Sequence, residues 1–284
     1  MAGLLDAVAV RASPLLLASR AGVGLDVWQQ EFLGVAGVSA EVWARLHGPV
    51  GLRGLLRCGR QTGKSLSLAV ACTYRALVEP ELDVVVVAPT AAQAAGLILK
   101  CKKIAQAAGL TLYRDAVTML HLAPGSRGRI IAIPASGSVR GLSTGLMAVD
   151  EGAWVGDEVY FAVLLPMLAA VPGSSLVAAS TPRGQTGWWY RAHEQEGEAW
   201  RRWSATWRDT GGRVSAEWVE AYRASVPAHV AAAEIDCDFV GSVGGVFSAQ
   251  LIDGMFTDND RLLFPADIFG PDWDDPKRDE GWPT

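Results

Sequence analysis

The sequence predicts an α/β fold, with a mainly parallel sheet and helices on both of its faces. From Leu52 onward, short segments rich in β-forming residues alternate with longer segments of helical length, which is typical of parallel strands joined by helices. The segment Asp83–Ala88 contains four consecutive valines, as expected for a strand buried on both faces. Half of the residues are apolar and 19% are charged, so the chain has ample material for a core.

The expected elements follow this alternation along the chain. Strands are expected at Leu52–Arg57, Asp83–Ala88, Arg129–Pro134, Gly145–Asp150 and Ser175–Ser180. Helices are expected at Lys64–Glu79, Ala91–Ala108 and Asp157–Ala170. Proline or glycine follows each helix, at Pro80, Gly109 and Pro172, where residues that end helices are common.

The segment after Pro182 is rich in tryptophan. Six tryptophans fall between positions 188 and 218: Trp188, Trp189, Trp200, Trp203, Trp207 and Trp218. We interpret them as core or subdomain packing, with an exposed base-stacking platform as the alternative. From Gly241 to Thr284, glycine, proline and acidic residues dominate, which indicates a linker or tail.

The net charge of −5 is concentrated at the C-terminal end of the chain. The segment Pro265–Thr284 supplies four of these five negative charges, so the rest of the chain is nearly neutral. Any contact with nucleic acid must therefore come from local basic patches. The candidate patches are Lys100, Lys102 and Lys103; Arg127 and Arg129; and Arg201 and Arg202.

The cysteines and the apolar runs exclude several classes of protein. The four cysteines form no Cys-x-x-Cys pair and do not cluster with the four histidines, so neither a disulfide framework nor a structural zinc site is predicted. No apolar run approaches the ~20 residues of a membrane span. Asp6 and Arg11 interrupt the apolar N-terminal segment, which argues against a signal peptide. We expect a cytoplasmic protein with no membrane partner.

The segment Cys58–Ser65, with the sequence CGRQTGKS, lies between an expected strand and an expected helix and resembles a P-loop (Walker A motif). In such a loop, backbone N–H groups surround the phosphates of ATP, Lys64 reaches the β- and γ-phosphate oxygens, and the Ser65 hydroxyl binds Mg²⁺. Cys58 replaces the usual first glycine, and the alternative is a plain glycine-rich turn. The residues expected to bind ATP here are Gly59, Arg60, Gln61, Thr62, Gly63, Lys64 and Ser65.

The apolar run Gly145–Asp150 ends in two adjacent carboxylates and resembles a Walker B strand. Asp150 is expected to hold Mg²⁺, while Glu151 is expected to orient and deprotonate the attacking water. The alternative is a solvated turn at the end of a strand. A glutamate directly after the aspartate favours hydrolysis over transfer to a bound metabolite, because it supplies a base for water.

These residues, together with other short motifs in the same order, resemble the ATPase domain of phage terminase large subunits, which package double-stranded DNA into procapsids. The other motifs are Trp28-Gln29, Ala88-Pro89-Thr90 with Gln93, Val139-Arg140-Gly141, and Ser180-Thr181-Pro182 with Gly187-Trp188. The resemblance covers roughly Trp28 to Phe247. It implies a P-loop NTPase of the additional-strand, catalytic-glutamate type.

The resemblance also implies roles for residues outside the two Walker motifs. Gln29 is expected to contact adenine, with Trp28 beside it, and Arg60 to sense phosphate. Ser180, Thr181 and Pro182 match the motif that couples hydrolysis to DNA movement. Arg140 matches the arginine that reaches into a neighbouring subunit's site and assists catalysis there. For Gln29 and Trp28 the alternative is a contact in the core, and for Arg60 it is a surface arginine. For Ser180-Thr181-Pro182 the alternative is a plain turn at the end of a strand, and for Arg140 it is a loop arginine paired with an acid.

The partners and location implied by the resemblance are those of a packaging motor. They are double-stranded DNA, the portal protein and the small terminase subunit, in the host cytoplasm at the procapsid portal. A homo-oligomeric ring is expected in the active state, with a monomer in isolation as the alternative.

The expected domain organisation is an ATPase domain at 1–247 and an acidic tail at 248–284. Within the ATPase domain, residues 1–50 form an adenine-side segment and residues 183–240 a tryptophan-rich subdomain. The chain is too short for the nuclease domain of a complete large subunit, so no nuclease activity is expected. The sequence thus predicts an ATP-hydrolysing DNA-packaging motor; the rivals are a helicase-like or other DNA-remodelling ATPase and a nucleotide-dependent module that docks on a portal.

Overall fold

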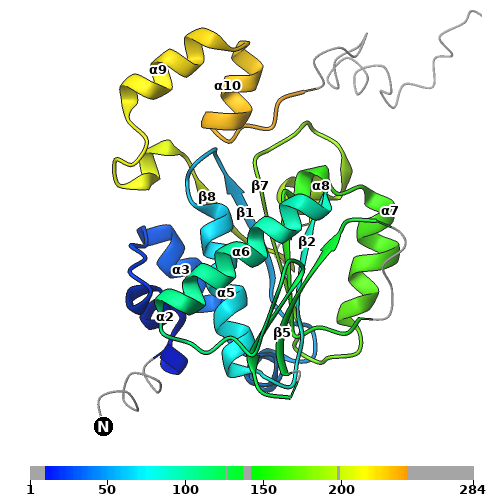
Figure 1. Cartoon of the computed structure of the whole chain (residues 1–284). Coiled ribbons are helices and arrows are strands. Elements are labelled where there is room, and N and C mark those ends of the chain that lie inside the picture. The colour runs from blue at the N-terminus through cyan, green and yellow to red at the C-terminus, as the bar shows by residue number, and fades with distance from the viewer. Residues whose placement is uncertain (1–9, 126, 137–141, 197–198, 242–284) are drawn as a thin grey trace, which may run out of the picture. The chain divides into compact units, whose positions relative to one another are not determined.

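The computed structural model describes residues 10–125, 127–136, 142–196 and 199–241. These residues contain an eight-stranded sheet with the strand order β3-β4-β5-β2-β6-β7-β1-β8 (Figure 1). The strands are β1 Arg53–Cys58, β2 Val84–Ala88, β3 Arg114–Ala116, β4 Met119–Ala123, β5 Arg127–Pro134, β6 Leu146–Asp150, β7 Ser175–Ser180 and β8 Arg201–Ala205. The prediction of an α/β fold is confirmed, and all five expected strands are present.

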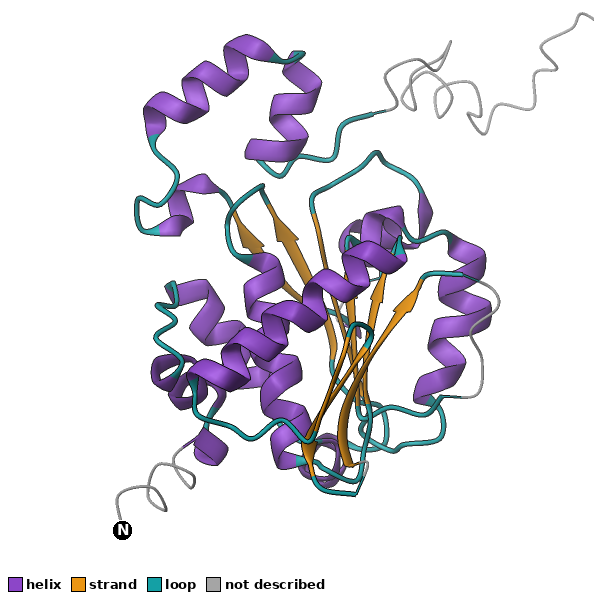
Figure 2. Cartoon of the chain, in the orientation of Figure 1, coloured by secondary structure: helices purple, strands orange, loops and turns teal. Residues whose placement is uncertain are grey.

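The sheet is mainly parallel, as predicted. The strands from β5 to β8 in the sheet order all pair in parallel, whereas β3 and β4 form an antiparallel hairpin beside β5. Because β1, β6 and β7 run in the same direction, their C-terminal ends lie along one edge of the sheet (Figure 2). In open α/β sheets this edge is where ligands bind.

Helices pack on both faces of the sheet, and the valine run of β2 explains why. Val84 and Val86 belong to one apolar core, while Val85 and Val87 belong to the other, because successive strand residues point to opposite faces. The first core includes residues of α2 Pro14–Arg20, α3 Val27–Ala36, α5 Lys64–Val78 and α6 Ala91–Ala107. The second includes residues of segment 157–168 and of α8 Gly187–Glu194.

Two expectations about secondary structure were wrong. The helix expected over Asp157–Ala170 is broken into a short α-helix, α7 Asp157–Val159, a π-helical turn at Tyr160–Leu164 and a 3-10 turn at Leu165–Leu168. Pro166 lies in this last turn, where it has no N–H to continue an α-helical ladder. The strands β3, β4 and β8 were not expected. Both β3 and β8 are short and largely exposed, so they lack an apolar pattern.

The tryptophans after Pro182 divide between different cores. Trp188, Trp189 and Trp200 are buried in the second core of the sheet, which confirms core packing for these three. Trp203 packs edge to face on Phe32 of α3. A small separate cluster of Val214, Val219 and Ile235 holds together α9 Ala216–Ser225 and α10 Ala228–Ile235.

The remaining described helix, α4 Ala40–His47, lies between α3 and β1 in the chain. Among the described residues, no helix combines the length and apolarity needed to cross a membrane. The domain boundary expected at residue 247 lies outside the described residues. All described residues belong to one unit, Met1–Val243.

Candidate nucleotide-binding site

The segment 58–65, which resembles a P-loop, connects the end of β1 to the start of α5, as predicted. Gly63 is the N-cap of α5 and has a φ of 100°, in the left-handed region that favours glycine. A Cβ atom at this position would lie 2.6 Å from Nε2 of Gln29, so a side chain does not fit here. The Thr62 hydroxyl donates to the Gly59 carbonyl at 2.9 Å and closes the turn.

Cys58, which replaces the usual first glycine of a P-loop, is the last residue of β1 and is fully buried. Burial raises the pKa of its thiol above the ordinary value, with the nearby Cys237 as a smaller cause. The following residue, Gly59, donates its N–H to the Ala205 carbonyl of β8 at 2.9 Å. Because of this hydrogen bond, the pairing between β1 and β8 continues one residue past Cys58 before the loop turns away.

Lys64 and Ser180 meet at Glu151. The Lys64 ammonium lies 3.1 Å from Oε1 of Glu151, and the Ser180 hydroxyl donates to Oε2 of the same carboxylate at 3.2 Å. Glu151 adopts a left-handed backbone conformation with a φ of 55°, directly after β6 ends. The three residues come from the ends of three strands or their following loops, so the parallel sheet brings them together.

Asp150 lies at the end of β6 and is 8% exposed. Burial is the main cause that raises the pKa of Asp150 above 3.8, while a hydrogen bond with Ser65 acts in the opposite direction. The expected metal ligands Ser65 and Asp150 therefore lie near each other in the fold. The described residues contain no group of three His, Cys, Asp or Glu side chains that could hold a metal alone. A Mg²⁺ ion at this pair would need further oxygens from phosphates and water, which is the usual arrangement at nucleotide sites.

Arg60 pairs with α10. Its guanidinium contacts both carboxylate oxygens of Glu234, at 2.6 and 3.3 Å, and the backbone N–H of Arg60 donates to the Glu234 carbonyl at 2.8 Å. The hydrogen bond to Glu234 is the largest cause that raises the pKa of Arg60. An arginine expected to face phosphate is thus held by a carboxylate of a helix that lies far away in sequence.

Gln29 is buried, and both ends of its side chain amide have partners in the protein. Its Oε1 accepts from the Asp26 N–H at 2.9 Å, and its Nε2 donates to the Ser67 hydroxyl at 3.0 Å and to the Gly63 carbonyl at 3.3 Å. Both N–H groups of Nε2 are therefore occupied within the protein, whereas Oε1 can accept one more hydrogen bond. Trp28 beside it is 7% exposed and belongs to the first core.

A cavity of about 390 Å³ lies over these strand ends. Its walls include Lys64, Glu151 and Thr181, together with Thr90 and Gln93 at the start of α6. Thr90 and Gln93 form a capping box at the N-terminus of α6, which holds this wall in place. The motif Ala88-Pro89-Thr90 with Gln93 therefore contributes to the same cavity as the two Walker-like segments.

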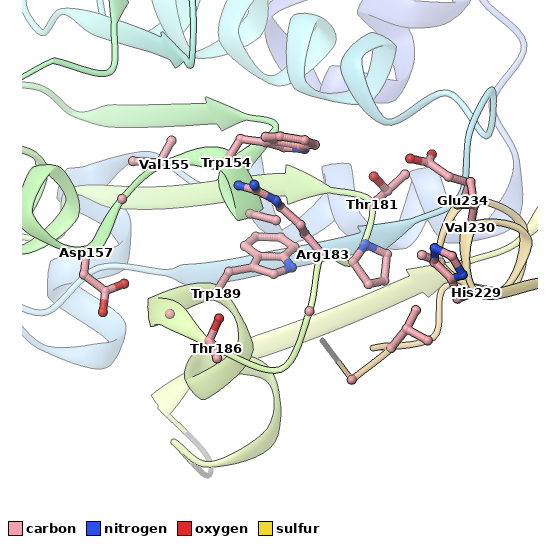
Figure 3. A pocket seen from close by; sticks show the side chains of 18 residues that line it. Trp154, Val155, Asp157, Thr181, Arg183, Thr186, Trp189, His229, Val230 and Glu234 are labelled. Atoms are coloured by element: carbon pink, nitrogen blue, oxygen red, sulfur yellow. The ribbon is translucent and has the colours of Figure 1, made fainter. Parts of the chain in front are cut away.

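A second cavity, of about 740 Å³, shares Trp154, Thr181 and Glu234 with the first. Figure 3 shows the Arg183 side chain extending toward the Trp154 ring inside this second cavity. Pro182 and Gly184 also line it. The expected coupling residues thus lie where the two cavities meet. The Ser180 hydroxyl bonds Glu151, Thr181 lines both cavities, and the loop after Pro182 lines the larger cavity.

Several residues of this region carried no signal in the sequence. They are Asp26, Trp154, Arg183, Arg213 and Glu234. None belongs to a motif, and each acquires its neighbours only through folding. Arg213, for example, donates to Asp26 and to the Thr62 carbonyl of the P-loop.

Several residues of the basic patches proposed to contact DNA have partners within the protein. Arg129 forms an ion pair with Asp83, Lys102 pairs with Asp115, and Arg202 donates to the Ala192 carbonyl. The patch residues Lys100, Lys103 and Arg201 are exposed. The side chain of Arg127 and the whole of Arg140 lie outside the described residues.

The fold is a mixed α/β fold with an eight-stranded, mainly parallel sheet and helices on both of its faces. Its structural neighbours are phage large terminase ATPase domains, and they cover most of the chain. The ATPase domain of the Thermus phage P74-26 large terminase has a TM-score of 0.61 and 19% sequence identity, with 78% of this chain and 97% of that chain covered.

The large terminase of the thermophilic bacteriophage D6E in complex with ATP-gamma-S has a TM-score of 0.59 and 15% identity. The match covers 76% of this chain and 53% of that chain, so this chain spans about half the length of that protein. No protein-family model and no curated protein matches the sequence. At these identities the comparisons establish a shared fold.

Proposed function

We propose that this chain is the ATP-hydrolysing motor domain of a viral DNA-packaging terminase, which moves double-stranded DNA into a procapsid. The observation that carries the proposal is the contact of both Lys64 and Ser180 with Glu151 at the ligand-binding edge of the sheet. A lysine in a phosphate-binding loop and a carboxylate that can position water are among the parts that P-loop enzymes use to bind and hydrolyse a nucleoside triphosphate.

The bound nucleotide is proposed to lie with its phosphates at the N-terminus of α5. There, Lys64 and the backbone N–H groups of residues 61–65 would neutralise the phosphate charge. Ser65 and Asp150 would hold Mg²⁺, which would supply positive charge to offset the charge that develops on the phosphates. When Lys64 turns to the phosphates, it leaves Glu151, whose carboxylate then becomes available to orient and deprotonate water. This assignment makes the protein a catalytic-glutamate P-loop ATPase.

Ser180, Thr181 and Pro182 are proposed to couple hydrolysis to DNA movement. Ser180 touches Glu151, and the residues that follow Pro182 line the larger cavity and lead into α8. A change at Glu151 during hydrolysis would therefore reach this loop through one hydrogen bond. The proposed domain is 1–247, with segment 1–50 on the adenine side, segment 183–240 after the coupling residues, and an acidic tail at 248–284.

The proposed partners are double-stranded DNA, a portal protein, a small terminase subunit and further copies of this chain in a ring. Arg140 is proposed to complete the site of a neighbouring copy. The proposed setting is the host cytoplasm at the procapsid portal.

The test is the ATPase rate measured over a range of protein concentrations, with and without linear duplex DNA. A rate per subunit that rises with concentration and with DNA supports a ring-forming DNA motor. Hydrolysis stimulated by single-stranded DNA alone would favour a helicase-like enzyme. Nucleotide binding with no hydrolysis under any of these conditions would favour a docking module.

A further inference from the structure

Asp26 and Arg213 form an ion pair beside the P-loop, although 187 positions separate them in the sequence. The two guanidinium nitrogens of Arg213 lie 2.8 and 2.5 Å from the two carboxylate oxygens of Asp26. Such a two-pronged contact fixes the plane of the guanidinium as well as its position. The hydrogen bond with Asp26 is the largest cause that raises the pKa of Arg213 above its ordinary value.

The same guanidinium also holds the P-loop backbone. Nη2 of Arg213 donates to the Thr62 carbonyl at 3.1 Å. The peptide bond between Thr62 and Gly63 is planar and trans, so its C=O and N–H point in opposite directions. Directing the Thr62 carbonyl toward Arg213 therefore turns the Gly63 N–H to the other side of the loop.

Gln29 fixes the orientation of the next peptide bond, which joins Gly63 to Lys64. The Gly63 carbonyl accepts from Nε2 of Gln29 at 3.3 Å, which directs the Lys64 N–H away from Gln29. Gln29 is itself fixed by a capping box with Asp26 at the start of α3. Asp26 thus supports both donors, one through its carboxylate and one through its backbone.

This support matters because Gly63 is the least restricted residue of the loop. Glycine populates positive and negative φ about equally, so the peptide before it can rotate with little steric resistance. A phosphate-binding loop works only when its N–H groups converge on the anion. Arg213 and Gln29 donate to the carbonyls of this loop, and in this way they keep its N–H groups directed toward the phosphate position before any ligand binds.

We propose that Arg213 is a positioning residue of the phosphate-binding loop, which it holds in its ligand-binding conformation through the Thr62 carbonyl with Asp26 as its anchor. This inference rests on the proposed nucleotide site. It assigns Arg213 to the loop and therefore to the polyphosphate part of the ligand, with no contribution to recognition of the base.

The experiment measures binding of two probes, ATP and inorganic tripolyphosphate, to the full chain by calorimetry. Arg213→Gln removes the charged donor, and losing one hydrogen bond to a charged group corresponds to an affinity loss of about 10-fold or more. Because the loop holds only phosphates, we expect the same fold-loss for both probes. Asp26→Asn leaves Arg213 able to donate to the Thr62 carbonyl, so this variant should lose less affinity for the two probes than Arg213→Gln.

Two further variants separate positioning from general stability. Arg45→Gln breaks the exposed pair of Arg45 with Glu41 on α4. Neither residue lines the cavity at the P-loop, so both affinities should stay unchanged. Arg213→Lys keeps a positive charge but cannot serve Asp26 and Thr62 with one rigid fork, so its affinity should fall between wild type and Arg213→Gln. Melting temperatures of all variants are compared to detect unfolding.

Each outcome has a defined meaning. Loss of ATP affinity without loss of tripolyphosphate affinity would overturn the proposal, because Arg213 would then recognise the nucleoside. Unchanged affinities for both probes in a folded Arg213→Gln protein would also overturn it. Failure of the proposed site itself is detected separately with Lys64→Ala, which must weaken both probes if the P-loop binds phosphate at all.

Discussion

Trp154 and Arg183 stack on each other, with the guanidinium carbon of Arg183 3.8 Å from the centroid of the Trp154 ring. Trp154 follows Glu151 by three residues, and Arg183 directly follows Pro182. The stack therefore joins the segment after the proposed catalytic base to the loop after the proposed coupling residues. Trp154 also lines both cavities, so its ring forms part of the wall between them.

Replacing Trp154 tests whether this wall contributes to hydrolysis. Trp154→Ala should lower kcat by about 10-fold, because water then enters around Glu151 and weakens the electrostatic interactions in the cleft. The affinity for ATP should change little, since the ring does not belong to the P-loop. Trp218→Ala is the matched control, because Trp218 is another exposed tryptophan and lies on α9. Equal effects of the two substitutions would contradict a specific role for Trp154.

Lys64 and Glu151 should give separable phenotypes. Lys64→Ala is expected to weaken ATP binding, because the phosphates lose their counter-charge. Glu151→Gln is expected to bind ATP normally and to lose hydrolysis by about 100-fold or more, because an amide cannot accept the proton of water. Calorimetry measures the first quantity and phosphate release the second. Near-normal turnover by Glu151→Gln would show that another group is the base.

The buried carboxyl of Asp150 predicts a pH-dependent stability. Its pKa is raised by burial, so the folded state binds a proton more tightly than the unfolded state, and the free energy of unfolding falls as pH rises from 3.8 through the folded pKa. Asp150→Asn removes this cost. Without nucleotide or metal, the variant should melt above wild type at pH 7.5, and this difference should shrink at pH 4.

Thermal melting at the two pH values measures this effect. Glu41→Gln is the control, since Glu41 is exposed on α4 and should show no such difference. A wild-type protein as stable as Asp150→Asn at both pH values would mean that burial imposes no net cost on the carboxylate, and the predicted pH dependence would then be wrong.

Arg140 remains a prediction, and a mixing experiment addresses it. Arg140 lies ten positions before Asp150 in the sequence, and we expect Arg140 to act on a neighbouring copy, where such an arginine contributes about 10³–10⁵ in rate. Arg140→Ala and Glu151→Gln should each be inactive alone. Mixed together, they should regain activity, because some interfaces combine an intact base with an intact arginine. Absence of rescue in a mixture shown to co-assemble would return Arg140 to a structural role.

Local sequence patterns predicted the parts of the site that lie close together in the chain. The five expected strands, the loop before α5 and the carboxylates after β6 are found where the patterns placed them. These features can be recognised because each depends on a few adjacent residues: an apolar run, a glycine that permits a φ of 100°, or a pair of acids at a strand end.

The sequence could not predict which partners the polar side chains choose. Arg60, which is expected to sense phosphate, pairs with Glu234, and Gln29, which is expected to contact adenine, bonds Asp26, Gly63 and Ser67. The two expected roles stay predictions. Both residues lie at the predicted site. Their partners come from other elements, and many arginines, glutamates and aspartates of this chain could have served equally well.

The amino-acid sequence by itself determined the α/β alternation, the loop that caps α5 and the acids at the end of β6, because these follow from periodicity and local backbone geometry. Only the tertiary structure decided that β1, β6 and β7 lie side by side and that Lys64, Glu151 and Ser180 therefore meet. The tertiary structure also brought Asp26 and Arg213 together as an ion pair beside Thr62. The physical reason is that strand order and side-chain pairing depend on how the whole core packs, and that information is distributed over residues far apart in the chain.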